Sequence, residues 1–339
     1  ASTGDPRPRR PWKNKYRLPE TAPFSSIVSL ALGNVSLELP TPDGGFPGFV
    51  MLKKLELKQV ADLGDLTPFL SNCPALEWLR ITHSFLPHLI VPQTTCCLRY
   101  LHVGECDIKS IDLHAMSLTT FEYVGRPFLP IKINDSLKLS EANVHLYWAY
   151  DSIGYFWDDL SCSFSHVDRL VLTFSMDRKT TTLIKNTTIF IRLRYLTLFC
   201  KTFGDPESAL VILRLTQILE AAPQLEHFVL HMDGLDSQPL YLNTTDSIRP
   251  YQHQHLKAVH MTGVFGLRGQ LELAKYILLS ADALEFMILN LAKKGYPDLP
   301  WKPDHAYFIT LEKFAKNYLD PEGAYRDVLK IVGLNLTAY

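Results

Sequence analysis

The stretch CPALEWLRI, from Cys73 to Ile81, returns in altered form as APQLEHFVL, from Ala222 to Leu230, and as ADALEFMIL, from Ala281 to Leu289. Each copy keeps apolar residues at the first, fourth and sixth positions of an L-x-x-L-x-L frame, whereas the residues between them change. Apolar residues at alternate positions are the pattern of a strand with one buried face. The stretch therefore predicts a short strand that belongs to a repeated unit.

The same frame is spread along most of the chain. Its first positions are Ile27, Leu52, Leu76, Leu98, Leu118, Val167, Leu193, Leu225, Leu256 and Leu284, with a degraded unit near 137–139. The spacing is about 20 to 25 residues in the first half and about 26 to 32 in the second, which is typical of divergent leucine-rich repeats.

A single unit of this size cannot fold alone. Its five or so apolar side chains contribute on the order of 10 kcal/mol when buried, whereas ordering the unit costs on the order of 36 kcal/mol. Stacked units share their buried faces and form a continuous core. We therefore predict an α/β leucine-rich-repeat solenoid, curved, with parallel strands on the concave face and with helices and turns on the convex face.

Three segments between the strands have the pattern of helices: residues 205–223, 267–283 and 303–321. The first has Asp205 as a candidate N-cap and Pro206 in its first turn. The third is expected to cap the C-terminal end of the array. Residues 140–166 leave two alternatives open, a break in the solenoid or an inserted loop.

The overall composition excludes several classes of function. The 34 Lys and Arg residues balance 35 Asp and Glu residues, which does not favour a nucleic-acid partner. The sequence contains no uninterrupted apolar run of membrane-spanning length and no signal-peptide pattern near its start, so we expect no membrane association. The six cysteines form no C-x-x-C pair and are interpreted as reduced, mostly core thiols of a cytoplasmic or nuclear protein.

No known catalytic signature is present in the chain. It lacks G-x-S-x-G, H-E-x-x-H, G-x-x-x-x-G-K and G-x-G-x-x-G, so we expect neither an enzyme nor a bound cofactor. His227, His231 and His260 are spaced so that they face one side of two strands. No cysteine or carboxylate at a matching position completes a zinc ligand set, and we predict no metal site.

Two longer segments resemble a plant protein family. FPGFVMLKKLELKQVADLGDLTPFLSNCPALEWLRI, residues 46–81, resembles the repeats of plant F-box/leucine-rich-repeat proteins, and residues 253–289 resemble their FBD-type C-terminal region. The resemblance implies a repeat array over 24–252 and FBD-like repeats with a capping helix over 253–339. Residues 1–23 are interpreted as a basic, Pro-rich, disordered linker, or alternatively as a nuclear-import or nucleic-acid-binding arm.

In that family an F-box binds a Skp1-like adaptor of a cullin ubiquitin ligase, and the repeats present a target protein. Residues 18–20, Leu-Pro-Glu, begin like an F-box, but Pro23 would break its first helix. The sequence therefore leaves two expectations: an F-box upstream of Ala1, or a repeat-only relative outside any ligase.

The changing positions of each strand predict where a partner binds. They carry side chains of the types that dominate protein interfaces, chiefly aromatic and basic. The candidate partner-binding residues on the concave face are Trp78, Arg80, Tyr100, His102 and Glu122, with a looser second group of Tyr195, His227 and Phe286. Packing of these aromatic residues beneath a covering helix or loop is the alternative. We expect a protein-binding module, or alternatively a scaffold, a decoy or a small-molecule co-receptor.

Overall fold

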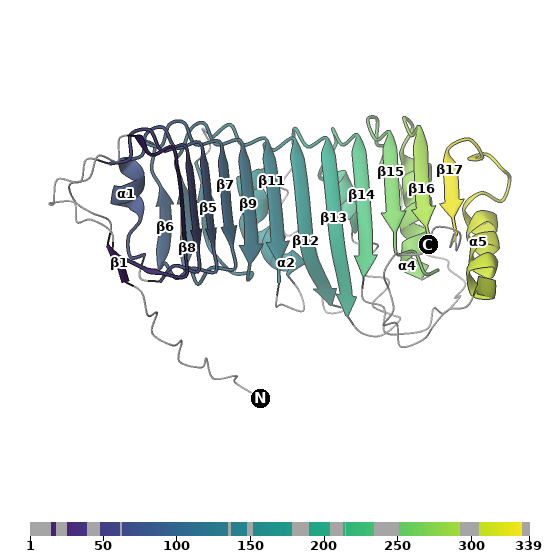
Figure 1. Ribbon diagram of the computed structural model, residues 1–339. Helices are drawn as coiled ribbons and strands as arrows, with labels where there is room; N and C mark the ends of the chain where they lie inside the picture. The colour runs from purple at the N-terminus through teal and green to yellow at the C-terminus, as the bar shows by residue number, and fades with distance from the viewer. Residues whose placement is uncertain are drawn as a thin grey trace. The chain divides into compact units, whose positions relative to one another are not determined.

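The computed structural model describes residues 15–17, 26–38, 48–61, 63–134, 137–147, 152–177, 190–203, 213, 215–233, 251–266, 268–291 and 305–333. The chain divides into two compact units. Unit 1 comprises residues 1–125 and 129–139, and unit 2 comprises residues 126–128 and 140–339. In both units the repeats supply parallel strands to a sheet, as the L-x-x-L-x-L frame predicts (Figure 1).

Unit 1 contains a main sheet of neighbouring parallel strands, in the order β2, β4, β5, β7 and β9. The strands are β2 (Ser29–Gly33), β4 (Lys54–Lys58), β5 (Trp78–Thr82), β7 (Tyr100–Gly104) and β9 (Thr120–Gly125). The second and third apolar positions of the frame lie in register: Leu55 is paired with Leu79 and Leu79 with Leu101. All three side chains are fully buried. The apolar residues of the frame therefore form the core.

A second parallel sheet in unit 1 departs from the expectation of helices on the convex side. It contains β6 (His88–Val91), β8 (Ser110–Leu113) and β10 (Ile131–Ile133), in the order β10, β8, β6. Leu89 and Ile111 are paired in this sheet and are fully buried. The connecting segments of these repeats are only long enough for one more short strand, so α1 (Thr67–Ser71) is the only helix in the described part of unit 1.

The described part of unit 2 contains seven neighbouring parallel strands. They are β11 (Glu141–Leu146), β12 (Arg169–Asp177), β13 (Tyr195–Phe203), β14 (His227–Asp233), β15 (Ala258–Thr262), β16 (Phe286–Asn290) and β17 (Leu329–Val332). Its longer repeats form helices, namely α2 (Ile153–Tyr155), α3 (Leu215–Glu220), α4 (Arg268–Ser280) and α5 (His305–Leu319). The helices predicted over 267–283 and 303–321 are confirmed as α4 and α5. Only the end of the one predicted over 205–223 is described, and Asp205 lies outside the described residues.

Two segments that the sequence left ambiguous have described parts within these units. In the segment 140–166, residues Glu141–Leu146 form β11, which pairs in register with β12, and the described part of the connection between them contains α2, the π-helical turn Phe156–Leu160 and the 3-10 turn Ser161–Phe164. Within the basic segment 1–23, residues Lys15–Arg17 form a strand, β1, paired with β3 (Ser36–Glu38). The expectation of disorder is wrong for these three residues, and the others lie outside the described part of the chain.

The ends of β2, β4, β5 and β7 are held by a repeated set of backbone hydrogen bonds. At the start of a strand, one carbonyl accepts two N–H groups from the next repeat; the accepting residues are Val28, Lys53, Glu77 and Arg99. The residue that follows the strand lies six positions after that accepting residue and has a left-handed backbone conformation. Its N–H donates to a backbone carbonyl of the following repeat; these residues are Asn34, Gln59, His83 and Glu105. Polar main-chain groups at both strand ends are therefore paired between repeats.

Candidate protein-binding surface

The outward face of the unit 1 main sheet brings together one predicted group of residues. Trp78 on β5 is paired in register with Tyr100 on β7, and Arg80 is paired with His102. His102 is in turn paired with Glu122 on β9. We call Lys54, Trp78, Arg80, Tyr100, His102 and Glu122 the unit 1 surface. Alternation along each strand places these side chains opposite the buried leucines.

The side chains of the unit 1 surface are ordered by contacts with one another. The Trp78 and Tyr100 rings are stacked, with centroids 5.4 Å apart and an angle of 5° between planes. Lys54 Nζ lies 4.4 Å from the centroid of the Trp78 ring on its other side. Cation–π contacts and offset stacking each contribute roughly 0.5 to 1.5 kcal/mol. The aromatic pair is therefore a rigid platform, which reduces the entropy that a partner would have to remove.

A carboxylate anchors the far side of this platform. Glu122 Oε2 accepts a hydrogen bond of 2.7 Å from the Tyr100 hydroxyl and lies 2.8 Å from Nδ1 of His102. Burial, together with the hydrogen bond to Glu122, raises the pKa of Tyr100 above its ordinary value. The phenol thus stays protonated and remains a donor at neutral pH. Its ring is held in the orientation that stacks on Trp78.

Arg80 differs from its neighbours because one of its donors is buried without an acceptor. Its Nε atom is buried and has no hydrogen-bond partner. Arg80 lies between Glu56 and His102 in register but forms no ion pair within the described part of the chain. An unpaired buried donor typically costs about 1 to 3 kcal/mol. The site therefore has an unmet requirement for an acceptor.

The second predicted group lies on the outward face of unit 2 and is only partly brought together. Tyr195 on β13 and His227 on β14 are stacked with centroids 4.8 Å apart, and the Arg169 guanidinium lies 4.3 Å from the Tyr195 centroid. Phe286, which is exposed, lies one strand further away, because Ala258 on β15 is paired with both His227 and Phe286. Phe286 therefore does not extend the Tyr195–His227 stack.

Sequence reasoning missed a second stack on the same face of unit 2. Phe199 and His231 stack with centroids 4.5 Å apart, and Nδ1 of His231 lies 2.8 Å from the Thr262 hydroxyl. β12 and β13 extend to nine residues, so they present more outward positions than the L-x-x-L-x-L frame contains. Continued alternation through Phe199 and Lys201 was the available signal. Lys54 and Arg169 differ from other outward-facing residues by their contacts with the Trp78 and Tyr195 rings, which the sequence does not reveal.

The three histidines considered as zinc ligands, His227, His231 and His260, are engaged in contacts with neighbouring rings. His231 and His260 are in edge contact with centroids 6.4 Å apart, while His227 stacks on Tyr195. Among the described residues, no cluster of three or more His, Cys, Asp or Glu side chains has the arrangement of a metal site.

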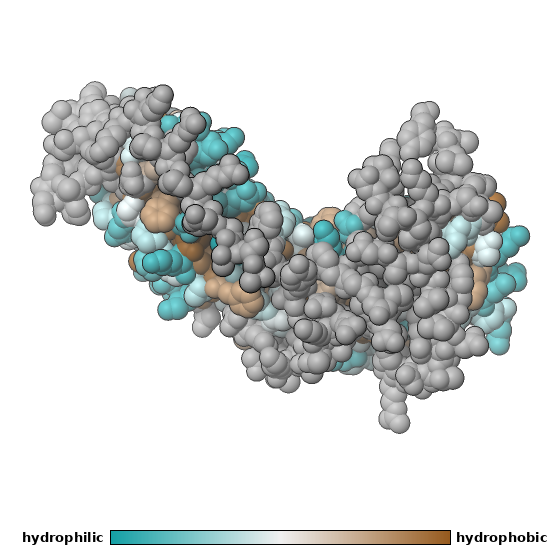
Figure 2. Space-filling model, turned by 90° about the horizontal axis from the view of Figure 1, so that it is seen from below, coloured by the Kyte–Doolittle hydropathy of each residue, from teal (hydrophilic) through white to brown (hydrophobic). Residues whose placement is uncertain are grey.

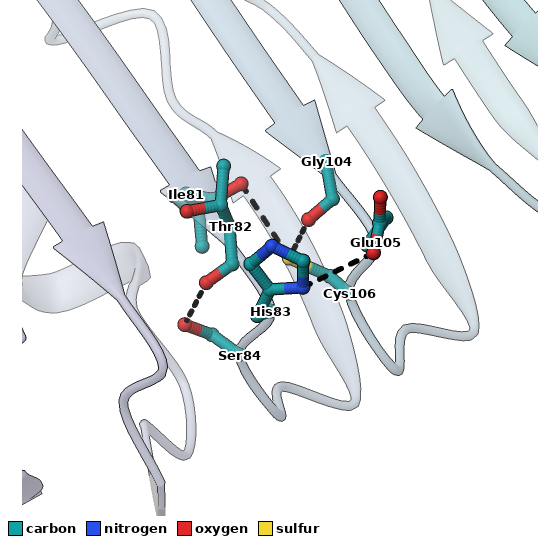
Figure 3. A network of polar contacts seen from close by, with 7 residues as sticks. All are labelled: Ile81, Thr82, His83, Ser84, Gly104, Glu105 and Cys106. Atoms are coloured by element: carbon teal, nitrogen blue, oxygen red, sulfur yellow. Dashed lines mark hydrogen bonds and ion pairs between the residues drawn. The ribbon is translucent and has the colours of Figure 1, made fainter. Parts of the chain in front are cut away.

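The residues that follow β5 and β7 form a polar network at the strand ends (Figure 3). The His83 ring lies 3.2 Å from the Glu105 carboxylate, close to Cys106. A cysteine with histidine and glutamate suggests nucleophilic chemistry, but the Cys106 thiol donates instead to the carbonyls of Ile81 and Gly104. Burial raises its pKa to about 11, so little thiolate exists at neutral pH. The network holds the two turns together.

The distribution of cysteines differs from the expectation of mostly core thiols. Cys73 and Cys200 are buried, whereas Cys96, Cys97 and Cys162 are exposed. Cys96 and Cys97 occupy a turn between Thr95 and Leu98. All six cysteines are free thiols in the structure.

The surface at the ends of the strands is chemically mixed. Figure 2, viewed from below the strands of Figure 1, shows hydrophobic residues interspersed with hydrophilic ones where the residues are coloured.

Within the described part of the chain, no helix has both the length and the apolar character needed to span a bilayer.

Parallel strands at each repeat, a buried leucine frame and variable outward positions define a leucine-rich-repeat protein. The chain belongs to the At1g61320/AtMIF1 LRR-domain family, whose model matches residues 12–308. Leucine-rich-repeat domains are typically protein-binding modules. None of the curated proteins compared with this chain matches it.

Two solved structures are similar to this chain at low identity. One, titled as a TLR13–ssRNA13 complex, is 13% identical with a TM-score of 0.35, covering 84% of this chain and 45% of that one. The other is the LRR ectodomain of the plant membrane receptor kinase GASSHO1/SCHENGEN3 from Arabidopsis thaliana, in complex with CASPARIAN STRIP INTEGRITY FACTOR 2. It is 14% identical with a TM-score of 0.24, covering 78% of this chain and 36% of that one. The chain thus spans less than half the length of either protein.

Proposed function

We propose that this chain is a non-enzymatic protein-binding module, and that the unit 1 surface contacts the partner. The observation that carries the proposal is the rigid Lys54–Trp78–Tyr100–Glu122 arrangement on the outward face of the sheet. Trp, Tyr and Arg are the residues that most often dominate the energy of a protein interface. Because these side chains are already ordered by one another, they would lose little further conformational entropy when a partner binds.

The proposal extends to a role in a ubiquitin ligase that acts on the bound partner. The resemblance of residues 46–81 and 253–289 to plant F-box/leucine-rich-repeat proteins supports a role as the target-recognition part of an F-box ubiquitin ligase subunit. In that role the array would hold a target protein while a Skp1-like adaptor contacts an F-box encoded upstream of Ala1, in the cytoplasm or nucleus. The alternative is a scaffold or decoy that binds a partner outside any ligase.

The binding role is tested by changing the platform and comparing captured partners. The chain carrying Trp78→Ala and Tyr100→Ala together is compared with wild type and with Lys132→Ala, an exposed residue of β10 in the second sheet of the same unit. Affinity purification with quantitative mass spectrometry from the source tissue measures the partners. We expect the double variant to lose partners that the Lys132→Ala variant keeps. An unchanged partner set with a folded double variant would refute the proposal.

The ligase role needs a separate experiment. Mapping the 5′ end of the transcript shows whether an in-frame F-box precedes Ala1, and co-purification of the full-length product tests for a Skp1-like adaptor. We expect both the F-box and the adaptor. A full-length product that lacks an F-box and binds no adaptor would leave the scaffold or decoy role.

A further inference from the structure

The unit 1 surface and its neighbours offer more unpaired positive charge than negative charge. Lys54 and Lys58 on β4 and Arg80 on β5 lie at outward positions, and none of the three forms an ion pair within the described residues. The acidic residues of the same face are Glu56 and Glu122. The Glu122 oxygen that faces Tyr100 and His102 already accepts from both of them. Within the described residues, the cations without an ion pair are therefore concentrated on β4 and β5, where Lys54 also contacts the Trp78 ring and Glu56 is the acidic residue beside them.

Arg80 is the cation most in need of a ligand. Its guanidinium makes no hydrogen bond in the described structure, and its Nε is out of contact with water. A carboxylate is the acceptor that matches a guanidinium best, because two parallel N–H groups can donate to its two oxygens. An incoming carboxylate would pair the charge through the accessible part of the half-buried Arg80 side chain.

The aromatic platform next to Arg80 adds a second requirement. Trp78 and Arg80 are two positions apart on β5, so their side chains share one face, and the Trp78–Tyr100 stack lies beside the guanidinium. A stacked Trp–Tyr pair offers apolar area to a ligand group next to the charge. The ligand should therefore combine acidic with apolar groups a few ångströms apart. An extended peptide meets this condition, because its alternate side chains face the same side.

We propose that the unit 1 surface binds an acidic, extended segment of a partner protein, with a carboxylate on Arg80 and an apolar side chain on the Trp78–Tyr100 platform. This inference rests on the proposed binding function and specifies the chemistry of the partner. The nucleic-acid alternative is less well supported, since the chain has a formal net charge of −1 and the face retains Glu56 among its cations.

The test uses defined probes and the full chain. The first probe is a fluorescein-labelled peptide of eight residues that repeats Glu-Ser-Leu-Ser, so that Glu and Leu lie on the same face of the extended chain, and its matched control repeats Gln-Ser-Leu-Ser. Binding is measured by fluorescence anisotropy at low and at moderate ionic strength. We expect the acidic peptide to bind more tightly than the control peptide and to weaken as salt is added.

Three single substitutions give the expected signs. Arg80→Gln should weaken acidic-peptide binding by about tenfold or more, since it removes a charge-assisted pair. Glu56→Gln should strengthen binding, because it removes the opposing carboxylate from the paired position on β4. Lys132→Gln, on the second sheet, should leave binding unchanged.

Equal binding of both peptides, or no change with Arg80→Gln, would overturn the inference. A labelled single-stranded DNA oligonucleotide that bound more tightly than the peptide and depended on Arg80 would also overturn it, in favour of nucleic acid. The outcome is separable from the proposed function. If natural partners are lost with the Trp78 and Tyr100 double variant but kept with Arg80→Gln, partner binding stands and the acidic chemistry is wrong.

Discussion

His253 provides a direct test of how a buried imidazole couples this fold to pH. Its side chain is 1% exposed, and neither ring nitrogen has a hydrogen-bond partner. The backbone N–H of His253 donates to the Ser280 carbonyl at 2.6 Å, and its imidazole ring packs edge-on against Tyr251. Burial lowers the pKa of His253 to about 4. The residue before it and the residue after it are exposed, so burial within this segment is confined to His253.

The sign of the effect follows from where the proton binds more tightly. The unfolded chain has an ordinary histidine pKa of about 6.5, so between the two values a proton stabilises the unfolded state. The contribution of His253 to stability is therefore fully present above pH 6.5 and is lost as the pH falls toward 4. The difference between the two pKa values, about 2.5, corresponds to about 3 kcal/mol of the free energy of unfolding. About 2 kcal/mol of this contribution is lost between pH 7 and pH 5.

The assay is urea unfolding of three proteins at pH 7, 6 and 5. Wild type is compared with His253→Leu, which keeps the site apolar and removes the titration. The control is His255→Gln, which removes an exposed imidazole two residues away. We expect wild type and His255→Gln to lose about 2 kcal/mol more than His253→Leu between pH 7 and pH 5. Parallel losses in all three proteins would refute the reasoning that His253 is kept neutral by burial.

Three further predictions concern stability and are measured by urea unfolding. Gln270→Leu should lower the free energy of unfolding by about 3 kcal/mol. The amide of this buried residue accepts from the Phe265 N–H and donates to the Gly263 carbonyl, both at 2.8 Å. An unchanged midpoint would contradict the pairing. His83→Gly should be about 1 kcal/mol more stable than His83→Ala, since φ is 51° there; equal stabilities would contradict the strain. Glu226→Gln should destabilise more at low salt than at high salt, because the carboxylate pairs with Arg194 at the surface. A salt-independent difference would contradict that pairing.

Much of the fold was predictable because one physical constraint recurs in every repeat. Apolar positions that must be buried cannot vary freely, so Leu79, Leu101 and Phe228 were recognised as core from their spacing alone, and all three are almost fully buried. The recurrence of Glu after the first Leu of the frame also has a physical basis. Glu77 pairs with Lys53 at 3.0 Å and Glu226 pairs with Arg194 at 2.6 Å, so this position alternates in charge between neighbouring repeats.

The second sheet of unit 1 and the stack of Phe199 on His231 were not predictable in the same way. Whether a connecting segment forms a helix or a short strand depends on its length and on its neighbours across the core, and SIDL at 110–113 has too few residues for a clear period. The outward positions are even less constrained. The alternation of residues showed which side chains face outward. That Arg80 Nε has no hydrogen-bond acceptor is known only once the neighbouring side chains are placed.

The constant distance between the shared carbonyl and the left-handed residue sets a rule for how this protein can change over evolutionary time. In unit 1 the two positions are always six residues apart, whereas the segments that connect one repeat to the next vary in length. A single inserted or deleted residue within those six would misalign one set of hydrogen bonds and turn the buried face outward. Gains and losses of sequence should therefore be tolerated in the connecting segments or as whole repeats. A strand should diversify only by substitution at its outward positions, which leaves the number of repeats and the identity of a few exposed side chains as the principal routes to a new partner.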